Sequence, residues 1–341
     1  MKKTLQYYPY FDWLRGLLAL VVMLSHEKVI AWQYAGDFAV QVFFALSGWL
    51  IGGVLLKTSS ADLPKFYFNR AIRIWIPYFI GLAILIIVSL LKEPITAKWI
   101  EFILYRITFV HNLFGVAQAK ILMPLQGTGN LYWSVNAEEQ FYLLAPILLV
   151  LLKPNIAKSV YFWVFIAIMA YITDTYASIV LGVLAAVIHY NFAGFYKNKV
   201  SQAILFSILL ISTLGFLWQF NFVLVAPFAS ISLVLLLARN GQKSKIGEII
   251  GGMSYPFYLN HWIGTFVGNA ILQQFNVKTI SLMSSLLVNV AISYCLYHYI
   301  DKPCLDKRDA WFSLARGKFI IAISYLTVSI GIMIGLFYKY A

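Results

Sequence analysis

Long apolar segments recur along this chain and restrict it to one class of protein. A helix needs about 20 apolar residues to cross a lipid bilayer. Segments of roughly that length lie at 10–30, 38–56, 74–91, 132–152, 159–173, 176–191, 202–219, 222–238, 254–275, 280–299 and 318–338. Hydrophobic residues make up 61% of the chain, whereas soluble domains contain about 45–50%. The sequence therefore predicts an all-α, polytopic integral membrane protein with about 11 transmembrane helices, in a range of roughly 10 to 12.

The basic residues predict the orientation of these helices. Cytoplasmic loops carry an excess of lysine and arginine, and most of the 26 basic residues fall in inner loops if the N-terminus is cytoplasmic. A weaker segment at 99–116 is interrupted by Arg106 and His111, and letting it cross would place most later basic clusters outside. We therefore expect 92–131 to be an outer segment folded back on the membrane. The net charge of +13 has the same origin, so nucleic acid is not an expected partner.

The sequence predicts one integral membrane domain over residues 1–341, with the segment at 318–338 as an additional C-terminal span. The longest polar stretches, 92–131 and 300–318, are too short to form an independent core. No internal repeat is visible. The two cysteines lack CxxC spacing, so neither a disulfide framework nor a metal site is expected.

The N-terminus resembles a signal peptide because Lys2 and Lys3 precede an apolar segment. That segment contains Arg15, however, and it lacks a small-residue cleavage site. We therefore expect it to be retained as the first span.

Charged residues inside that first span mark it as a candidate site. In DWLRGLLALVVMLSH, Arg15 and His26 are about three helical turns, or roughly 16 Å, apart on one stripe of the helix. Asp12 lies one turn before Arg15 on the same side. An ionisable residue within a membrane span is costly and is a functional-site hypothesis by default.

Two arginines follow the second span, in FYFNRAIRIWIPYF at 66–79, which we expect to be a cytoplasmic loop. Arg70 and Arg73 are three residues apart and share one helical face. Two guanidinium groups on one face form a fork for phosphate oxygens. The spacing alone favours the alternative, an ordinary positive-inside anchor.

Two adjacent glutamates occur in LYWSVNAEEQFYLLAP at 131–146. Ser134 is a plausible N-cap, and Glu138 and Glu139 in the first turns would suit the helix dipole. Since one of the two must face protein rather than lipid, it also needs a partner. His26 and Arg15 are the obvious candidates.

A third polar cluster lies in GGMSYPFYLNHWIG at 251–264. Ser254 can cap a helix there and Pro256 fits its first turn, which would put Tyr258 and His261 on one face. A single histidine in a span is more often a hydrogen-bonded packing residue than a catalyst.

Small residues distinguish the second span, AVQVFFALSGWLIGG at 39–53. Ser47 and Gly48 interrupt an aromatic run. Small side chains allow helices to approach closely within a membrane. Close packing is therefore the expected role of this pair.

Several of these blocks resemble motifs of the membrane-bound acyltransferase family 3. DWLR followed by His26 resembles its arginine–ten residues–histidine signature, and FFALSGWLI resembles FFVLSGFLI. FYFNRAIRIWIPYF resembles its R-x-x-R motif with the following proline. YWSVNAEEQFYLLAP is similar to W-S-x-x-x-E-E-Q-F-Y-L-x-x-P, SYPFYLNH to S-Y-x-x-Y-L-x-H, and DKP to E-K-P. The resemblance covers residues 7–303, and the order of the motifs makes it specific.

The chain also departs from the family pattern. The family usually has G-V-D before its FF pair, whereas Ala39, Val40 and Gln41 stand here. A carboxylate near the start of the second span is therefore missing. The chain also lacks the soluble hydrolase-like domain that some members append, so we expect no second transfer step from this polypeptide.

The resemblance implies a membrane O-acyltransferase. Family members are thought to take an acyl group, commonly acetyl, from cytoplasmic acyl-coenzyme A, with no tightly bound cofactor. The expected acceptor is a hydroxyl of a cell-surface or lipid-linked glycan at or beyond the outer face. The expected location is a bacterial inner membrane, crossed several times. The resemblance leaves the acceptor, the acyl chain length and the oligomeric state open.

The resemblance also suggests roles for individual residues. His26 is the expected general base, because the histidine pKa lies near neutrality, and an acyl-histidine intermediate is the alternative. Either Glu138 or Glu139 would orient its imidazole. Arg15 would contact the donor or be fixed by Asp12. The expected binding residues for donor or acceptor are Arg70, Arg73, Asp12, Ser47, Tyr258 and His261.

A transporter is the competing function. A chain with many spans and buried ionisable groups can move a lipid-linked or acidic solute, with proton coupling through His26 and Glu138. The missing internal repeat and the ordered motifs favour acyl transfer instead. A non-catalytic subunit of a glycan-assembly complex is a third reading, and it receives little weight because the His, Arg and Glu positions are all present.

Overall fold

The computed structural model describes residues 7–115, 124–174 and 176–340, which are mostly helical and contain no strand. Contacts divide the chain into two compact units. The first comprises Met1–Ser60 and Ala145–Ser254, and the second Ala61–Leu144 and Tyr255–Ala341. The chain passes between the units at three points: after Ser60, within α7 (Trp133–Pro146) and within α13 (Lys245–Phe275). The last two points lie close to Pro146 and Pro256.

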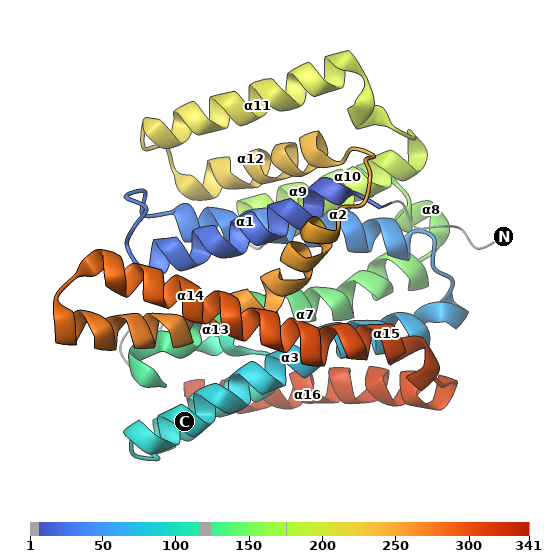
Figure 1. Cartoon of the computed structure of the whole chain (residues 1–341). Coiled ribbons are helices and arrows are strands. Elements are labelled where there is room, and N and C mark those ends of the chain that lie inside the picture. Colours follow the sequence, from blue (N-terminus) through green and yellow to red (C-terminus); the bar gives the residue numbers. More distant parts are fainter. Residues whose placement is uncertain (1–6, 116–123, 175, 341) are drawn as a thin grey trace. The chain divides into compact units, whose positions relative to one another are not determined.

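The first unit is built around α2. Its helices are α1 (Pro9–His26), α2 (Ala35–Leu55), α8 (Pro154–Ala157), α9 (Val160–Ile172), α10 (Ala177–Asn191), α11 (Lys199–Leu217), α12 (Phe222–Leu237) and the start of α13, with the short elements η3 (Ile147–Leu151) and η4 (Phe195–Lys197). Helix α2 packs against α1, α10 and α12, and α11 lies beside α12 (Figure 1).

Glycines set the closest helix crossing in that unit. A methyl group on Gly48 would overlap the backbone oxygen of Ile179, and one on Gly182 would come within 2.9 Å of the Gly48 Cα. The backbones of α2 and α10 therefore touch, as small residues allow in membrane helices. The packing role expected for Gly48 is confirmed.

The second unit is built around α3. It contains α3 (Leu63–Lys92), α4 (Ala97–Ile107), α5 (His111–Phe114), α7, the rest of α13, α14 (Lys278–Leu296), α15 (Lys302–Trp311) and α16 (Leu314–Tyr340), with η2 (Leu125–Tyr132), η5 (Tyr297–Asp301) and most of η1 (Ser60–Asp62). Helix α3 packs along α16 and also contacts α4, α15, η2 and η5.

The chain is an all-α membrane protein, as the sequence predicts. Each of the eleven predicted segments coincides with a helix, and 99–116 divides into the short helices α4 and α5. Five helical stretches of the described residues are long and apolar enough to cross a membrane: Ala35–Leu55, Ser60–Lys92, Lys199–Leu217, Lys278–Trp311 and Leu314–Tyr340. Three shorter apolar helices accompany them. The count of eleven and the orientation remain predictions.

Some predicted helix starts are wrong. Segment 66–79 is not a loop but part of α3, because Pro64 opens the helix and no breaker follows before Pro77. Ser134 lies inside α7 rather than capping it, since the preceding turn already accepts the Trp133 N–H at Asn130.

Helix α13 also starts earlier than predicted. It begins at Lys245, so that Ser254 and Pro256 lie in its interior. The Ser254 hydroxyl donates to the Gly251 carbonyl, 2.7 Å away, and does not cap a helix. Pro256 is tolerated in the interior, as prolines often are in membrane helices.

Candidate functional site

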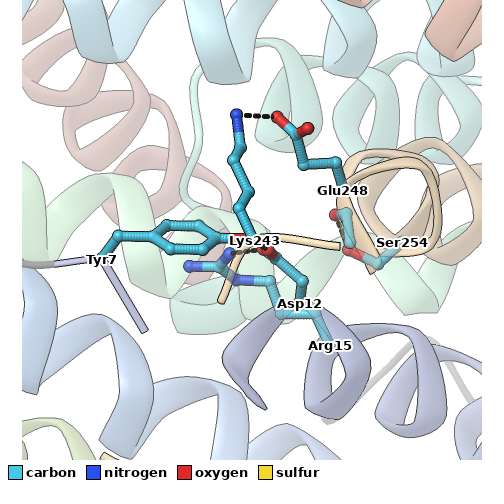
Figure 2. Close-up of polar contacts among 7 residues, drawn as sticks. Tyr7, Asp12, Arg15, Lys243, Glu248 and Ser254 are labelled. Atoms are coloured by element: carbon cyan, nitrogen blue, oxygen red, sulfur yellow. Dashed lines mark hydrogen bonds and ion pairs between the residues drawn. The ribbon is translucent and has the colours of Figure 1, made fainter. Parts of the chain in front are cut away.

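Arg15 in the first unit is held by Asp12. Its Nη1 lies 3.3 Å from Asp12 Oδ1, one turn away on α1. The Tyr7 hydroxyl donates to the other carboxylate oxygen of Asp12 (Figure 2). Of the two roles expected for Arg15, this geometry supports fixation by Asp12.

The start of α13 extends this network. Gly251 packs so closely on Asp12 that a Cβ there would lie 2.7 Å from the Asp12 Cβ. Lys243 pairs with Glu248, and its Nζ lies 5.9 Å from the centre of the Tyr7 ring (Figure 2). Burial and the Asp12 carboxylate raise the pKa of Tyr7 to about 12, so Tyr7 remains a donor at neutral pH.

His26 ends α1 and its side chain is exposed in the structure. The carboxylates of Asp37 and Glu27 interact electrostatically with its imidazole. Neither acid was among the candidate residues of the sequence. His26 belongs to the first unit and Glu138 and Glu139 to the second, so the expected pairing between them remains a prediction.

Arg70 and Glu138 meet in the second unit through Tyr142. The Cζ of Arg70 lies 5.8 Å from the centre of the Tyr142 ring. The Tyr142 hydroxyl donates to Glu138 Oε1, one turn earlier on α7. Two residues expected in separate subsites therefore share one cluster. The four-residue spacing of Glu138 and Tyr142 was the signal available in the sequence.

Further charges complete this cluster, which we call the arginine cluster: Arg70 and Arg73 on α3 with Arg308 on α15. Arg308 acts electrostatically on Arg70, and Asp301 interacts with Arg73. All three arginines are half-buried. The Arg70 Nε is buried with no hydrogen-bond partner among the described residues.

Glu139 faces a different neighbour from Glu138. Its side chain is 5% exposed, and its Oε1 accepts a hydrogen bond of 3.0 Å from the Trp75 Nε1 on α3. Its Oε2 is buried without a hydrogen-bond partner in the described part of the chain. Of the two glutamates, Glu138 is therefore the one that joins the arginine cluster.

Tyr258 and His261 lie in the interior of the second unit. The hydroxyls of Tyr258 and Ser134 are 2.6 Å apart, and Tyr258 also donates to the Leu131 carbonyl at 3.0 Å. His261 Nδ1 lies 2.8 Å from the Tyr258 carbonyl and is therefore the protonated nitrogen. Ser47 is half-buried on α2. The binding roles of these residues remain predictions.

One buried polar cluster, around Arg106, was not predicted from the sequence. Arg106 is fully buried and donates to the carbonyls of Gly129 at 3.1 Å and Phe102 at 2.7 Å. Its Nη2 lies 3.4 Å from His111 Nε2, which also lies 3.2 Å from Asn130 Oδ1. Burial lowers the pKa of Arg106 to about 10, and burial beside Arg106 lowers that of His111 far below its ordinary value.

These contacts join α4, α5 and η2, the elements that form most of the expected outer segment. The signal in the sequence was the interruption of an apolar stretch by Arg106 and His111. That interruption served to place the segment outside, but it also marked a site where both side chains are buried.

Comparison with known proteins decides the family. A family model described as an acyltransferase domain matches residues 8–298. The chain belongs to this acyltransferase family. The resemblance seen in its motifs is thereby confirmed. No solved structure matches the chain.

Two curated O-acetyltransferases are similar to this chain in sequence. The O-acetyltransferase OatA of Staphylococcus aureus (strain NCTC 8325 / PS 47) is 24% identical over 97% of this chain and 64% of its own length. The peptidoglycan O-acetyltransferase OatA of Listeria monocytogenes is 31% identical over 45% of this chain and 26% of its own length. The chain thus spans less than two thirds of each of these two relatives.

Proposed function

We propose that this chain is a membrane O-acyltransferase that moves an acyl group from cytoplasmic acyl-coenzyme A to a hydroxyl of a cell-surface or lipid-linked glycan. Family membership supports acyl transfer. The names of the relatives support acetyl as the group and peptidoglycan as one acceptor of this class. The apolar helices support a place in a membrane, for which we propose the bacterial inner membrane.

The arginine cluster carries the donor side of the proposal. Coenzyme A presents several phosphates, and arginine binds phosphate oxygens through paired N–H donors. Arg70 and Arg73 lie near the start of α3, and Arg308 lies on α15. The buried Nε of Arg70 has no hydrogen-bond partner in the described part of the chain. Three positive charges close together repel one another, and a bound anion would offset this repulsion.

His26 carries the acceptor side. The imidazole takes the proton of the acceptor hydroxyl while the oxygen attacks the thioester carbonyl. The carbon–sulfur bond then breaks, and the proton passes to the sulfur, which leaves as free coenzyme A. In the two-step alternative, the imidazole itself attacks the thioester, the carbon–sulfur bond breaks, and the sulfur takes up the imidazole proton and leaves as free coenzyme A. The acceptor hydroxyl then attacks the acyl-imidazole, and its proton passes to the imidazole as the acyl–nitrogen bond breaks.

Radiolabelled acetyl-coenzyme A tests this function in membrane vesicles from cells that express the chain, because such vesicles contain their own glycans. We expect label in the glycan fraction with the unchanged chain and loss of that label with folded His26→Ala. Near-normal transfer by His26→Ala would contradict the assignment of the base. Solute uptake without any acylation would favour the transporter instead.

A rapid quench in denaturant near neutral pH separates the two chemical routes. Label that is found on the unchanged protein after purification in detergent away from glycan acceptor, and is absent from His26→Ala, indicates an acyl-histidine intermediate. Transfer without labelled protein indicates direct attack by the acceptor hydroxyl.

A further inference from the structure

The end of α1 lies against the beginning of α2. A Cβ on Gly36 would lie 3.1 Å from the Ser25 Oγ and 3.3 Å from the Ser25 Cβ, so the Gly36 backbone lies close to the Ser25 side chain. The next residue along each helix is ionisable, His26 on α1 and Asp37 on α2. Their side chains are exposed and interact electrostatically.

Gln41, which stands where the family usually has aspartate, suggests a role for Asp37 beside His26. The family resemblance places a carboxylate where Gln41 stands, and Gln41 instead accepts a hydrogen bond of 2.5 Å from Ser178 on α10. Asp37 precedes Gln41 by four residues, which is one turn on the same face of α2. The chain therefore retains a carboxylate on that face, displaced toward the start of the helix.

We propose that Asp37 is the positioning residue for His26 and takes the place of the carboxylate that Gln41 lacks. This inference rests on the proposed function, in which His26 removes the hydroxyl proton. The Asp37 carboxylate would accept an N–H of the imidazole and fix which nitrogen faces the acceptor. It would also stabilise the imidazolium that forms when the proton arrives.

Glu27 is the other carboxylate that acts on His26. Its geometry is less suited to positioning the imidazole. It follows α1 as the first residue outside the helix, immediately before Lys28, whose φ is +54°. Its Oε1 is buried and has no hydrogen-bond partner among the described residues. Asp37, by contrast, lies in the first turn of a helix packed on three neighbours, and a rigid element holds a positioning group better.

The alternative role for Asp37 is purely structural, because an acid in the first turn of a helix suits the helix dipole. Kinetics separate the two roles. We would measure kcat and the KM for acetyl-coenzyme A in vesicles containing the full chain, for Asp37→Asn, Asp37→Glu and the matched control Glu27→Gln. Thermal unfolding in detergent would confirm that each variant folds, and Asp37→Ser replaces Asp37→Asn if that variant does not.

We expect Asp37→Asn to lower kcat by roughly 10²-fold or more while the KM for acetyl-coenzyme A stays within about twofold. Asp37→Glu should restore most of kcat, and Glu27→Gln should behave like the unchanged chain. Adding Gln41→Asp to Asp37→Asn should restore part of kcat, because it returns a carboxylate to the same face.

Three outcomes would overturn the inference. If Asp37→Asn keeps a near-normal kcat while His26→Ala is inactive, the positioning role fails and the proposed function stands. Equal losses in Asp37→Asn and Glu27→Gln would remove the special role of Asp37. If His26→Ala is active, the proposed base and this inference fail together.

Discussion

The guanidinium of Arg70 lies over the ring of Tyr142, with 5.8 Å between the Arg70 Cζ and the ring centre. The same tyrosine donates its hydroxyl hydrogen to Glu138. Tyr142 thus contacts both the cation and the acid. Because the buried Arg70 Nε has no hydrogen-bond partner among the described residues, it is available to an anion.

Removing the Tyr142 hydroxyl tests this arrangement. In Tyr142→Phe the ring remains under Arg70, but Glu138 loses the Tyr142 donor and can turn toward Arg70. We expect the KM for acetyl-coenzyme A to rise by about tenfold, since a hydrogen bond to a charged group contributes about 1.5–3 kcal/mol. Steady-state kinetics would show this, and an unchanged KM would contradict the role given to Tyr142.

Donor binding should depend on all three members of the arginine cluster. Arg70→Ala combined with Arg73→Ala should weaken binding of acetyl-coenzyme A by at least roughly tenfold, and Arg308→Gln alone by a smaller factor. Arg70→Lys should also bind less well, because lysine cannot form the paired donors. The exposed residue Lys307 provides the matched control, Lys307→Gln. Unchanged donor affinity in the double variant would return these arginines to the role of membrane anchors.

Two glycines of α2 make a matched pair for a stability test. Gly48→Ala would force a methyl group into the α10 backbone, and overpacking costs about 1–3 kcal/mol. A Cβ on Gly53 meets nothing within 4 Å, so Gly53→Ala should be neutral or stabilising by up to about 1 kcal/mol. Thermal unfolding in one detergent would compare them. Equal midpoints would show that α2 and α10 do not meet at Gly48.

His111 makes stability depend on pH. The pKa of His111 in the folded chain lies far below its ordinary value of 6.5. Below pH 6.5, therefore, His111 binds a proton in the unfolded chain but not in the folded chain. Stability should therefore fall as pH drops below about 6.5, by at most about 1.4 kcal/mol per pH unit, and should be independent of His111 above it. Unfolding midpoints from pH 5 to 8 measure this. His111→Gln should have a shallower profile, and an unchanged slope would contradict the assignment.

Much of the fold follows from the sequence because bilayer thickness fixes how long an apolar helix must be. The eleven predicted segments all correspond to helices. The helix starts were less accurate, since apolar composition marks where lipid begins rather than where a helix begins. Helix α3 starts at Leu63 and α13 at Lys245, in both cases well before the apolar segment.

The site was predictable only where partners lie within one helix. The pair Asp12–Arg15 follows from three-residue spacing. Trp75 and Glu139, by contrast, are 64 residues apart in sequence, and nothing in either segment indicates that they meet. The same holds for Arg70 and Arg308, because their electrostatic interaction depends on how α15 packs on α3.

The contact between Gly48 and Gly182 has a consequence for synthesis. Helix α2 emerges from the ribosome early, whereas α10 follows only after α3 to α9. Membrane helices insert first and associate afterwards. Helix α2 is therefore inserted in the bilayer before α10 has been synthesised. The contact between Gly48 and Gly182, and with it the core of the first unit, can form only late in translation.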